Sequence, residues 1–314
     1  MNNIFLIGTG QMAIDYANVL KAQNQNFKVI GRGESSASKF EEVTGIKPAT
    51  GGIDEYLRNN PFPGNAYVII ATGTQDLMQT MLTVLRAGAY KVLVEKPAAL
   101  SIEELLENEA TLKPYADKVF VAYNRRFYAS VIEAQRLIEE DGGLKSMHFE
   151  FTEWAHKIEP LEKAPGVKEN WFFANSTHVV DLAFYMAGAP LDWKAYSKPG
   201  DLKWHKKINF AGAGITDKGV LFSYLSNWES AGRWGIELLT GKRRIYLKPL
   251  EGILLQPKGS VQLSEYTFDN HLDVEFKPGL FLQTETFLNN GLKVLKSIDE
   301  HITSAESLYL KILG

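Results

Sequence analysis

Short apolar runs alternate with amphipathic stretches over residues 1–122. The apolar runs occupy residues 4–7, 27–30, 67–71, 91–94 and 118–122. Runs of this length between turn signals are typical of strands that are buried on both faces. Helical spacing of apolar residues fills the intervals, at residues 12–22, 37–44, 77–87 and 102–112. This alternation predicts a doubly wound parallel sheet of the Rossmann type with right-handed crossovers.

The pattern changes after residue 122. A helix is expected over residues 130–139, followed by longer alternating strands at residues 147–154, 220–228, 234–239 and 244–247. Further helices are expected at residues 178–186, 281–294 and 305–313. Turn segments separate the strands, as in an antiparallel sheet. The chain is therefore predicted to hold two domains, residues 1–122 and 123–314, the second an α+β domain with an open, mainly antiparallel sheet.

The predicted second sheet carries large apolar residues at alternate positions, namely Phe222, Tyr224, Trp228, Trp234, Ile236 and Leu238. One face of the sheet must cover helices, and we expect several of the aromatic residues to remain for the other face. An exposed apolar face usually marks a protein partner. We therefore expect a homodimer or homotetramer built through this sheet, unless every aromatic residue lies on the covered face.

Composition narrows the possible functions. The chain has 314 residues, 45% of them hydrophobic, and a net charge of -3. This charge provides no basic surface for nucleic acid or an anionic membrane. The sequence contains no cysteine, which excludes disulfides, thiolate metal sites and cysteine nucleophiles. No targeting segment or apolar span is visible, so we expect a cytoplasmic protein that binds neither membrane nor nucleic acid, and no metal site is expected.

A glycine-rich turn follows the first apolar run and reads Gly8-Thr9-Gly10-Gln11-Met12-Ala13. In a dinucleotide site of this G-x-G-x-x-A type, the first glycine permits the tight turn and the second lets a diphosphate approach the backbone. The helix that follows directs its free N–H groups and positive end at the phosphates. We expect Gly8, Thr9, Gly10, Gln11 and Met12 to bind the cofactor. The alternative is an ordinary strand-to-helix turn.

The end of the second predicted strand favours NADP over NAD. An NAD site usually places a carboxylate here to hold the ribose 2′-hydroxyl group, but this sequence has Gly31, which leaves room at that position. Arg32 can face a 2′-phosphate group, and Ser35 and Ser36 can donate hydrogen bonds to it. The alternative is that Arg32 is a solvated loop residue and that Glu34 binds the ribose.

Two further strand ends carry candidate residues. Ala71, Thr72 and Gly73 follow the third apolar run, at the sheet edge where ligands bind in α/β proteins; an ordinary strand-end turn fits them equally well. Val94-Glu95-Lys96-Pro97 ends the fourth run. A lysine there can stabilise negative charge on a substrate oxygen, although most lysines are surface residues.

Together with the glycine turn, Glu95-Lys96-Pro97, Tyr123-Asn124-Arg125-Arg126-Phe127 and Asn175-Ser176-Thr177-His178-Val179-Val180-Asp181 resemble the Gfo/Idh/MocA oxidoreductase family. The resemblance covers nearly the whole chain. It implies a final helix that returns to the first domain and an active site in the cleft between the domains. It also implies a cis bond before Pro97, a role for Lys96 beside the nicotinamide, and cofactor contacts by Glu95, Asn124 and Arg125. Interdomain ion pairing is the alternative role for the arginine residues.

His178 is the candidate acid/base, because histidine can take and return a proton near neutral pH. Asp181 lies on the same helical face and can orient the imidazole or bind substrate; the alternative for His178 is a satisfied core residue. Many members of the family carry an aspartate four residues before this histidine, where the present chain has Ala174. Trp171 and Tyr123 are possible walls for a sugar ring, but aromatic residues are more often core.

The sequence thus predicts an NADP-preferring or NAD-dependent enzyme. It would transfer a hydride between nicotinamide and a secondary alcohol or ketone of a sugar, nucleotide sugar or cyclitol. Two alternatives remain at this point: a cofactor-sensing regulatory protein on the same fold, suggested by Ala174, and an imine or enone reductase.

Overall fold

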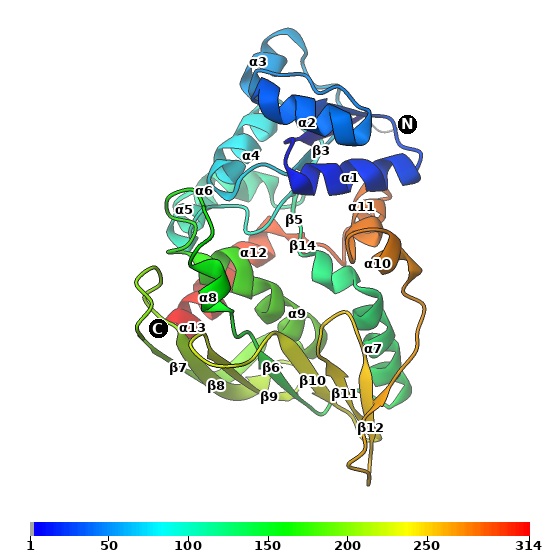
Figure 1. Cartoon of the computed structure of the whole chain (residues 1–314), viewed down its shortest axis with the longest axis vertical. Helices are drawn as coiled ribbons and strands as arrows, with labels where there is room; N and C mark the ends of the chain where they lie inside the picture. Colours follow the sequence, from blue (N-terminus) through cyan, green and yellow to red (C-terminus); the bar gives the residue numbers. More distant parts are fainter. Residues whose placement is uncertain (1–2) are drawn as a thin grey trace. The chain divides into compact units, whose positions relative to one another are not determined.

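The computed structural model describes residues 3–314 (Figure 1). The chain divides into two compact units. The first unit extends to Asn124 and also includes Glu275–Thr303, and the second consists of Arg125–Val274 and Ser304–Gly314. Within residues 3–314, no helix is both long and apolar enough to cross a membrane. The domain boundaries at residues 122 and 123 stay a prediction.

The first unit is built on a six-stranded sheet in the order β14-β5-β4-β3-β1-β2. Its strands are β1 (Asn3–Ile7), β2 (Phe27–Ile30), β3 (Ala66–Ile70), β4 (Lys91–Val94), β5 (Val119–Val121) and β14 (Lys296–Ser297). All neighbours pair in parallel except β14, which pairs antiparallel to β5. β3 is buried along its whole length, as a strand covered on both faces must be. The predicted Rossmann fold is confirmed.

Helices connect these strands or pack on them. They are α1 (Gln11–Ala22), α2 (Glu34–Thr44), α3 (Gly52–Asn59), α4 (Leu77–Arg86), α5 (Ile102–Glu107), α6 (Glu109–Leu112), α11 (Leu280–Leu288) and α12 (Ile298–Ser304). The helix predicted over residues 102–112 is broken at Asn108, which caps α5 and precedes α6. The helix predicted over residues 281–294 ends earlier than expected, because Asn289, Asn290 and Gly291 follow Leu288, and Asn290 adopts a φ of 60°.

β1 lies between β2 and β3, so the connections from β1 to β2 and from β2 to β3 lead to opposite sides of β1. Ligands of open α/β sheets bind where the strand order reverses in this way. Gly8 follows β1 and Ala71 follows β3, and the Ala71 amide donates to the carbonyl of Ile7 at 2.8 Å. The two predicted cofactor-binding segments, which begin at Gly8 and at Ala71, therefore start next to each other at the same edge of the sheet.

The second unit is built on an eight-stranded sheet in the order β13-β12-β11-β10-β6-β9-β8-β7. Its strands are β6 (Ser146–Glu150), β7 (Pro190–Lys198), β8 (Asn209–Thr216), β9 (Leu221–Asn227), β10 (Gly235–Leu239), β11 (Arg243–Leu247), β12 (Leu254–Pro257) and β13 (Ser264–Glu265). Every pair is antiparallel except β6 and β9, which pair in parallel. The predicted open, mainly antiparallel sheet is confirmed.

Helices of this unit pack on one face of the sheet, with α9 (Thr177–Ala187) on β6 and β10, α7 (Ala129–Glu140) on β11, and α13 (Leu310–Leu313) on β7 and β8. Two other short helices are α8 (Ala155–Ile158) and α10 (His271–Glu275). Two predicted helices begin with a π-helical turn, Phe172–Ser176 before α9 and Ala305–Tyr309 before α13.

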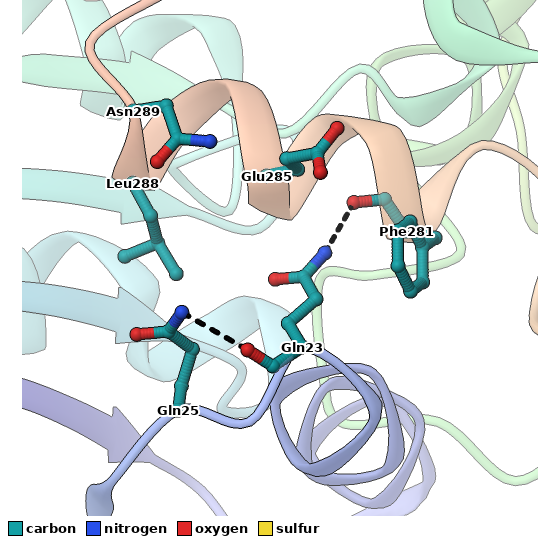
Figure 2. A pocket seen from close by; sticks show the side chains of 6 residues that line it. All are labelled: Gln23, Gln25, Phe281, Glu285, Leu288 and Asn289. Carbon is teal, nitrogen blue, oxygen red and sulfur yellow. Dashed lines mark hydrogen bonds between the residues drawn. The ribbon is translucent and has the colours of Figure 1, made fainter.

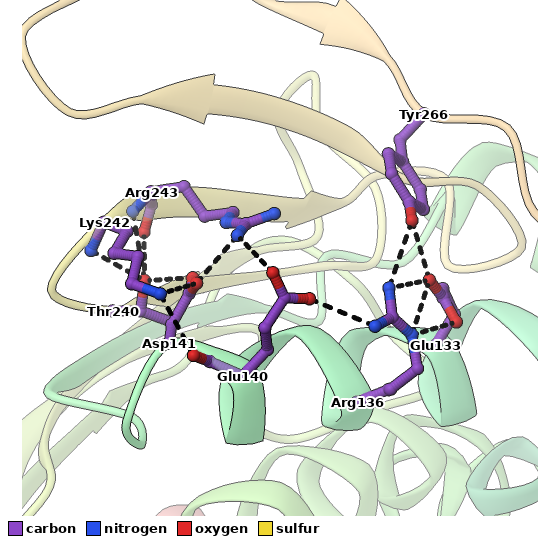
Figure 3. A network of polar contacts seen from close by, with 8 residues as sticks. All are labelled: Glu133, Arg136, Glu140, Asp141, Thr240, Lys242, Arg243 and Tyr266. Atoms are coloured by element: carbon purple, nitrogen blue, oxygen red, sulfur yellow. Dashed lines mark hydrogen bonds and ion pairs between the residues drawn. The ribbon is translucent and has the colours of Figure 1, made fainter.

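Polar contacts fix α7 to the hairpin between β10 and β11 (Figure 3). Asp141, directly after α7, accepts hydrogen bonds from Thr240 at 2.8 Å and from Arg243 at 2.7 Å. Arg136 of α7 pairs with Glu133 and Glu140, and Tyr266 donates to Glu133. Burial opposes ionisation of Asp141, but the hydrogen bonds from Thr240 and Arg243 hold the pKa of this carboxyl below its usual range.

The prediction that several of the six alternating apolar residues remain for the uncovered face of the sheet is wrong. All six of the alternating residues are buried: Phe222, Tyr224, Trp228, Trp234, Ile236 and Leu238. Because they occupy alternate positions, their side chains lie on the same face of the sheet, which is the face that the helices cover. The opposite phase of β9 instead exposes Leu221 and Leu225, which are 60% and 56% exposed. Tyr196 of β7, 70% exposed, lies in the same cross-strand row as Leu225 through Ala211.

Candidate active site

The two glycine residues of the turn after β1 differ in their surroundings. Gly8 has a φ of +123°, and a Cβ atom there would lie 2.3 Å from the carbonyl oxygen of Ala71. Gly10 caps α1 with an ordinary φ of -82°, and a Cβ atom there would meet nothing within 4 Å. The fold therefore requires a glycine at position 8, whereas the empty space beside Gly10 is available to a ligand.

The N-terminus of α1 is suited to an anion. No side chain among residues 3–314 caps it, and its first turn contains no acidic residue. Its first N–H groups and positive dipole end therefore have no competing side-chain acceptor there. The side chains of Thr9 and Gln11 form hydrogen bonds elsewhere. The Thr9 hydroxyl donates to Ser36 at 3.0 Å, and the Gln11 amide donates to Asp15 at 2.9 Å. Met12 is half-buried in the first turn of the helix.

The strand end after β3 adds a polar group at the same edge. The Thr72 hydroxyl is buried and has no hydrogen-bond partner among residues 3–314. The Thr72 backbone nitrogen would lie 3.3 Å from a Cβ atom on Gly8, so this residue borders the glycine turn. A buried hydroxyl group without a partner is costly and usually meets a ligand or water. The free helix end, the space at Gly10 and this hydroxyl together fit a diphosphate-bearing cofactor.

The residues predicted to select the cofactor lie at the end of β2 and the start of α2. Arg32 is exposed, and its guanidinium lies 3.4 Å from Asp76. The carboxylate of Glu34 accepts from Thr50 at 2.7 Å. Ser36 donates to the carbonyl of Gly33 at 3.0 Å, and Ser35 lies beside it in the first turn of α2.

Gly31 does not leave the room that the sequence suggested. A Cβ atom on Gly31 would lie 2.7 Å from Cγ2 of Thr9. A carboxylate side chain at this position would therefore require Thr9 to rotate. The present position of the Thr9 side chain therefore disfavours a carboxylate here.

Glu95 and Lys96 follow β4, and the Lys96–Pro97 bond is cis, as the resemblance implied. The Glu95 carboxylate accepts a hydrogen bond from the Tyr16 hydroxyl at 2.9 Å. His301 of α12 is buried, and its Nε2 atom lies 2.9 Å from the carbonyl oxygen of Pro97. The segment that carries Lys96 is thus fixed on both sides by side chains of the same unit.

The residues after β5 are largely buried. Tyr123 is a core residue whose ring lies 5.6 Å from that of His301, so it is not an open wall for a sugar. The Asn124 amide donates to the carbonyl of Pro278 at 2.9 Å. Arg125 is the first residue of the second unit. Trp171 is also buried, with its ring 6.3 Å from that of Trp204.

In the second unit, His178 and Asp181 are both buried residues of α9, which is buried along most of its length. Asp181 accepts two hydrogen bonds from Arg126, each of 2.8 Å. This bidentate ion pair is nearly enclosed, with 10% of the Arg126 side chain and 2% of the Asp181 side chain exposed. The ring of His178 lies 6.1 Å from that of Trp234. The sequence did not suggest Arg126 as the partner of Asp181.

Trp234 makes cation–π contacts with two arginine residues. The guanidinium groups of Arg125 and Arg233 each lie 4.8 Å from the Trp234 rings, and Arg233 also lies 4.6 Å from the rings of Trp154. Burial lowers the pKa of Arg125, although the nearby Tyr128, Glu251 and Glu153 partly offset this effect. His178 therefore neighbours an aromatic residue that two cations contact.

Glu153 is the functional candidate that the sequence reasoning missed. Its side chain is 1% exposed and accepts hydrogen bonds from Ser176 at 2.8 Å and from Asn175 at 3.0 and 3.2 Å. Arg233 lies 3.6 Å away. Burial raises the pKa of Glu153 above its usual range, opposed by Ser176, Arg233 and Asn175. A buried carboxylate thus holds the π-helical turn that leads into the His178 helix, a type of turn that is frequent at functional sites.

A shallow pocket of about 140 Å³ lies elsewhere in the first unit, between the end of α1 and α11 (Figure 2). The Gln23 amide donates to the carbonyl of Phe281 at 2.9 Å, and the Gln25 amide donates to the carbonyl of Gln23 at 3.1 Å. α1 has 12 residues, so this pocket lies roughly 18 Å along the helix from the glycine turn. It is separate from the cofactor edge.

The fold and the glycine turn define a two-unit protein with a dinucleotide-binding Rossmann unit. Residues 2–123 match the GFO_IDH_MocA family, described as an oxidoreductase family with an NAD-binding Rossmann fold. The resemblance to the Gfo/Idh/MocA family is thereby confirmed over these residues. No curated protein matches the chain.

Solved structures share the fold over nearly the whole chain. An oxidoreductase from Agrobacterium radiobacter, in complex with NAD+, L-tartaric acid and magnesium, is 15% identical, with a TM-score of 0.75 and coverage of 100% of this chain and 96% of that chain. Levoglucosan dehydrogenase, in complex with NADH and L-sorbose, is 17% identical, with a TM-score of 0.73 and coverage of 97% and 94%. The WlbA dehydrogenase from Bordetella pertussis, in complex with NADH and UDP-GlcNAcA, is 16% identical, with a TM-score of 0.69 and coverage of 100% and 96%.

Proposed function

We propose that this chain is a nicotinamide-dependent oxidoreductase. It transfers a hydride between the cofactor and a secondary alcohol or ketone of a sugar, nucleotide sugar or cyclitol. The observation that carries the proposal is the uncapped N-terminus of α1 with empty space at Gly10, at the reversal point of a parallel sheet. The similar structures with NADH and L-sorbose, and with NADH and UDP-GlcNAcA, support this substrate class.

The chain's own residues are assigned as follows. The α1 N-terminus and Thr72 bind the diphosphate, and the bound nicotinamide supplies or accepts the hydride. Lys96 stabilises the negative charge that develops on the reacting oxygen. His178 takes the hydroxyl proton when the alcohol is oxidised and returns it when the ketone is reduced. The Arg126–Asp181 pair keeps the face of α9 that carries His178 in place.

We propose NADP as the preferred cofactor. Arg32 is exposed, and among residues 3–314 its one ion pair is the weak one with Asp76, so it can pair with a 2′-phosphate. Thr9 occupies the space that a carboxylate at position 31 would need. Glu34 is engaged by Thr50, which weakens its candidacy for the ribose. The similar structures described above carry NAD+ or NADH, so this preference rests on the residues of this chain.

His178→Asn tests the catalytic assignment. Loss of the proton relay should lower turnover by about 10²- to 10⁴-fold while the cofactor still binds with unchanged affinity. His148→Asn is the matched control, because His148 of β6 bonds to Ser223 at the opposite face of the sheet and should keep full turnover. Turnover in His178→Asn equal to that of the control would remove His178 from the mechanism.

Ala174 favours a second candidate, a cofactor-sensing protein that has lost catalysis. Its side chain is small and buried, where the family often has an aspartate. Mixing the protein and its bound oxidised cofactor with a panel of sugars, in a stopped-flow spectrometer, distinguishes the two candidates. Reduction of the cofactor supports the enzyme, and binding without reduction supports the sensor. Turnover of an imine or enone but of no alcohol would instead support a reductase of that class.

We also propose that the protein is a homodimer or homotetramer through the uncovered face of the second sheet. Leu221, Leu225 and Tyr196 give this face its exposed apolar surface. Leu225→Arg should lower the mass measured by sedimentation to that of a monomer. Val43→Arg, at an exposed position of α2, is the control. A monomeric wild-type protein at micromolar concentration would reject the proposal.

A further inference from the structure

One arginine of the second unit contacts two tryptophan rings. The guanidinium group of Arg233 lies 4.6 Å from the ring of Trp154 and 4.8 Å from that of Trp234. The neighbouring backbone is also held, because Trp154 Nε1 donates to the carbonyl of Gly232 at 2.8 Å and the backbone N–H of Arg233 donates to Glu150 at 3.2 Å. A guanidinium group that lies against an aromatic ring keeps the N–H groups of its edge for other partners. The position of this cation is therefore largely set before a ligand binds.

Arg233 has an incomplete set of partners. Its side chain is 42% exposed, and its one ion pair among residues 3–314 is with Glu153 at 3.6 Å. The Glu153 carboxylate accepts shorter hydrogen bonds from Ser176 at 2.8 Å and from Asn175 at 3.0 Å. The guanidinium group of Arg233 therefore keeps N–H donors for a further acceptor. The geometry of these donors matches the two oxygens of a carboxylate.

Trp234 adds a second donor. Its side chain is 6% exposed, and its Nε1 atom is buried and has no acceptor among residues 3–314. A buried donor without an acceptor is costly and usually meets a ligand or water. Nε1 belongs to the indole that Arg233 contacts, and the ring of His178 lies 6.1 Å from the same indole. The free donor is thus close to both the cation and the proposed proton relay.

A second cation makes the surroundings of Trp234 more positive. The guanidinium group of Arg125 lies 4.8 Å from the Trp234 ring. Burial is the main cause of the lowered pKa of Arg125, and repulsion by Arg233 adds to it. Tyr128, Glu251 and Glu153 oppose this effect only in part, since the pKa stays lowered. An anion bound beside Trp234 would reduce the repulsion between the two cations.

Trp154 provides an exposed ring next to these donors. The sequence suggested Trp171 and Tyr123 as walls for a sugar ring, but both are buried, whereas Trp154 is 45% exposed. An exposed indole offers an apolar surface to the C–H groups of a sugar ring and excludes water from it. The cation, the free indole N–H group and the exposed ring together fit a sugar that carries a carboxylate.

We propose that Arg233 and the indole N–H group of Trp234 bind the carboxylate of a sugar acid whose ring lies against Trp154. Arg125 supplies additional positive charge. This inference rests on the proposed function for the reaction itself and narrows its substrate class. It gives Arg125 a role toward the substrate, in place of the cofactor contact that the family resemblance implied.

Calorimetric titration with D-glucuronate and with D-glucose tests the proposal. The titrations use the full chain at constant ionic strength, without cofactor and with the reduced cofactor bound. D-glucuronate should bind about tenfold more tightly than D-glucose, because its carboxylate adds hydrogen bonds to a charged group. Arg233→Gln should remove this preference and leave the affinity for D-glucose unchanged. Equal affinities in the wild type, or an unchanged preference in Arg233→Gln, overturn the proposal.

Arg244→Gln is the matched control. Arg244 lies in the same unit, 5.1 Å from the ring of Tyr246, pairs with Glu237, and has a side chain that is 38% exposed. This variant removes the same charge from a similar environment and should keep the preference for D-glucuronate. Equal losses in Arg233→Gln and Arg244→Gln would show a general effect of charge and overturn the proposal.

Trp234→Phe tests the second donor, since it removes the N–H group and keeps an aromatic ring. It should weaken D-glucuronate binding by about 3- to 10-fold, and an unchanged affinity overturns the role of Trp234. Arg233 is half-exposed, so Arg233→Gln carries the test even if Trp234→Phe fails to fold. Inorganic phosphate is the charge-only probe. If it binds as tightly as D-glucuronate and displaces it, the site accepts any anion and the proposed sugar acid is wrong.

The outcome also separates this inference from the proposed function. If D-glucuronate binds selectively through Arg233 but no sugar or sugar acid is turned over, the binding site is supported and the proposed function fails. If neutral sugars are turned over as efficiently as sugar acids, and Arg233→Gln changes neither, the inference fails and the proposed function stands.

Discussion

Gly10→Ala should leave the fold intact and weaken cofactor binding. Position 10 has a φ of -82°, which alanine adopts without strain, and a Cβ atom there meets nothing within 4 Å. Alanine caps a helix less well than glycine by roughly 0.5–1 kcal/mol. It also reduces the entropy of the unfolded chain, which stabilises the fold by about 0.4–1 kcal/mol. The two effects nearly cancel, so the Tm should change by less than about 2 °C.

The expected loss of binding is larger. The methyl group occupies the space through which a diphosphate would approach the first N–H groups of α1. Hydrogen bonds to a charged group contribute about 1.5–3 kcal/mol each. If one such bond is lost, the affinity for the cofactor falls by roughly 10- to 150-fold. Isothermal titration calorimetry with NADP and with NAD measures this change, and differential scanning calorimetry measures the Tm.

Gly8→Ala is the opposite case and completes the test. A φ of +123° is strained for alanine, at a cost of about 1–3 kcal/mol. The added Cβ atom would lie 2.3 Å from a backbone oxygen that cannot rotate away. We expect a total loss above about 3 kcal/mol and a Tm lower by roughly 6–12 °C. Wild-type affinity in Gly10→Ala, or a wild-type Tm in Gly8→Ala, would refute the division of roles between the two glycine residues.

Three further predictions concern single side chains. Arg32→Gln should weaken NADP binding by about tenfold and leave NAD binding unchanged, because it removes only the partner of the 2′-phosphate; equal losses for both cofactors in calorimetry would contradict the NADP preference. Asp141→Asn should cost about 3 kcal/mol at neutral pH, because it leaves Arg243 without its buried partner. The pKa of Asp141 is lowered in the folded state, so its contribution is present above the usual carboxyl range and is lost as the pH falls; in urea titrations at several pH values, a cost that does not shrink in acid would argue against this account. For Glu153 the pH dependence of stability has the opposite direction. Its pKa is raised in the folded state, so the stability of the wild type should decline as the pH rises through that pKa. The Glu153→Gln variant should not show this decline. Parallel stability curves for the wild type and Glu153→Gln between about pH 4 and 8 would show that Glu153 does not titrate in this way.

The first unit could be predicted well because its signals are local. Strands such as β3 are buried on both faces, so each appears in the sequence as a continuous apolar run. The glycine turn was recognisable because Gly8, Gly10 and Ala13 have fixed positions relative to the strand and the helix. β14, in contrast, is two residues long and pairs with β5 across a wide sequence separation, and nothing in its sequence indicates this pairing.

The second unit was harder to predict because its strands depend on their neighbours. β8 reads NFAGAGIT, and its glycine and alanine residues have low strand propensity. It is held between β7 and β9, which no local pattern reveals. β7 begins at Pro190 and lies at the edge of the sheet, where proline is tolerated.

Part of the candidate site left a signal that sequence reasoning did not use. Met147, Phe149 and Phe151 occupy alternate positions of the strand predicted at residues 147–154, and Glu153 continues this spacing, although β6 itself ends at Glu150. A carboxylate in the inward phase of a strand must find buried partners. The bond between Glu95 and Tyr16 had no such signal, since 79 positions separate the two residues and only the folded sheet brings them together.

The first unit is assembled from two separate stretches of the chain, with Glu275–Thr303 packed beside residues up to Asn124. During synthesis, the N-terminal stretch therefore emerges from the ribosome roughly 150 residues before the segment that completes it. Until then, the open edge of β5 lacks its pairing with β14, and α1 lacks its packing against α11. A nascent chain of this protein is thus exposed to strand-edge aggregation for longer than a chain whose Rossmann unit is continuous. Separate expression of residues 1–124 would make this incomplete state permanent.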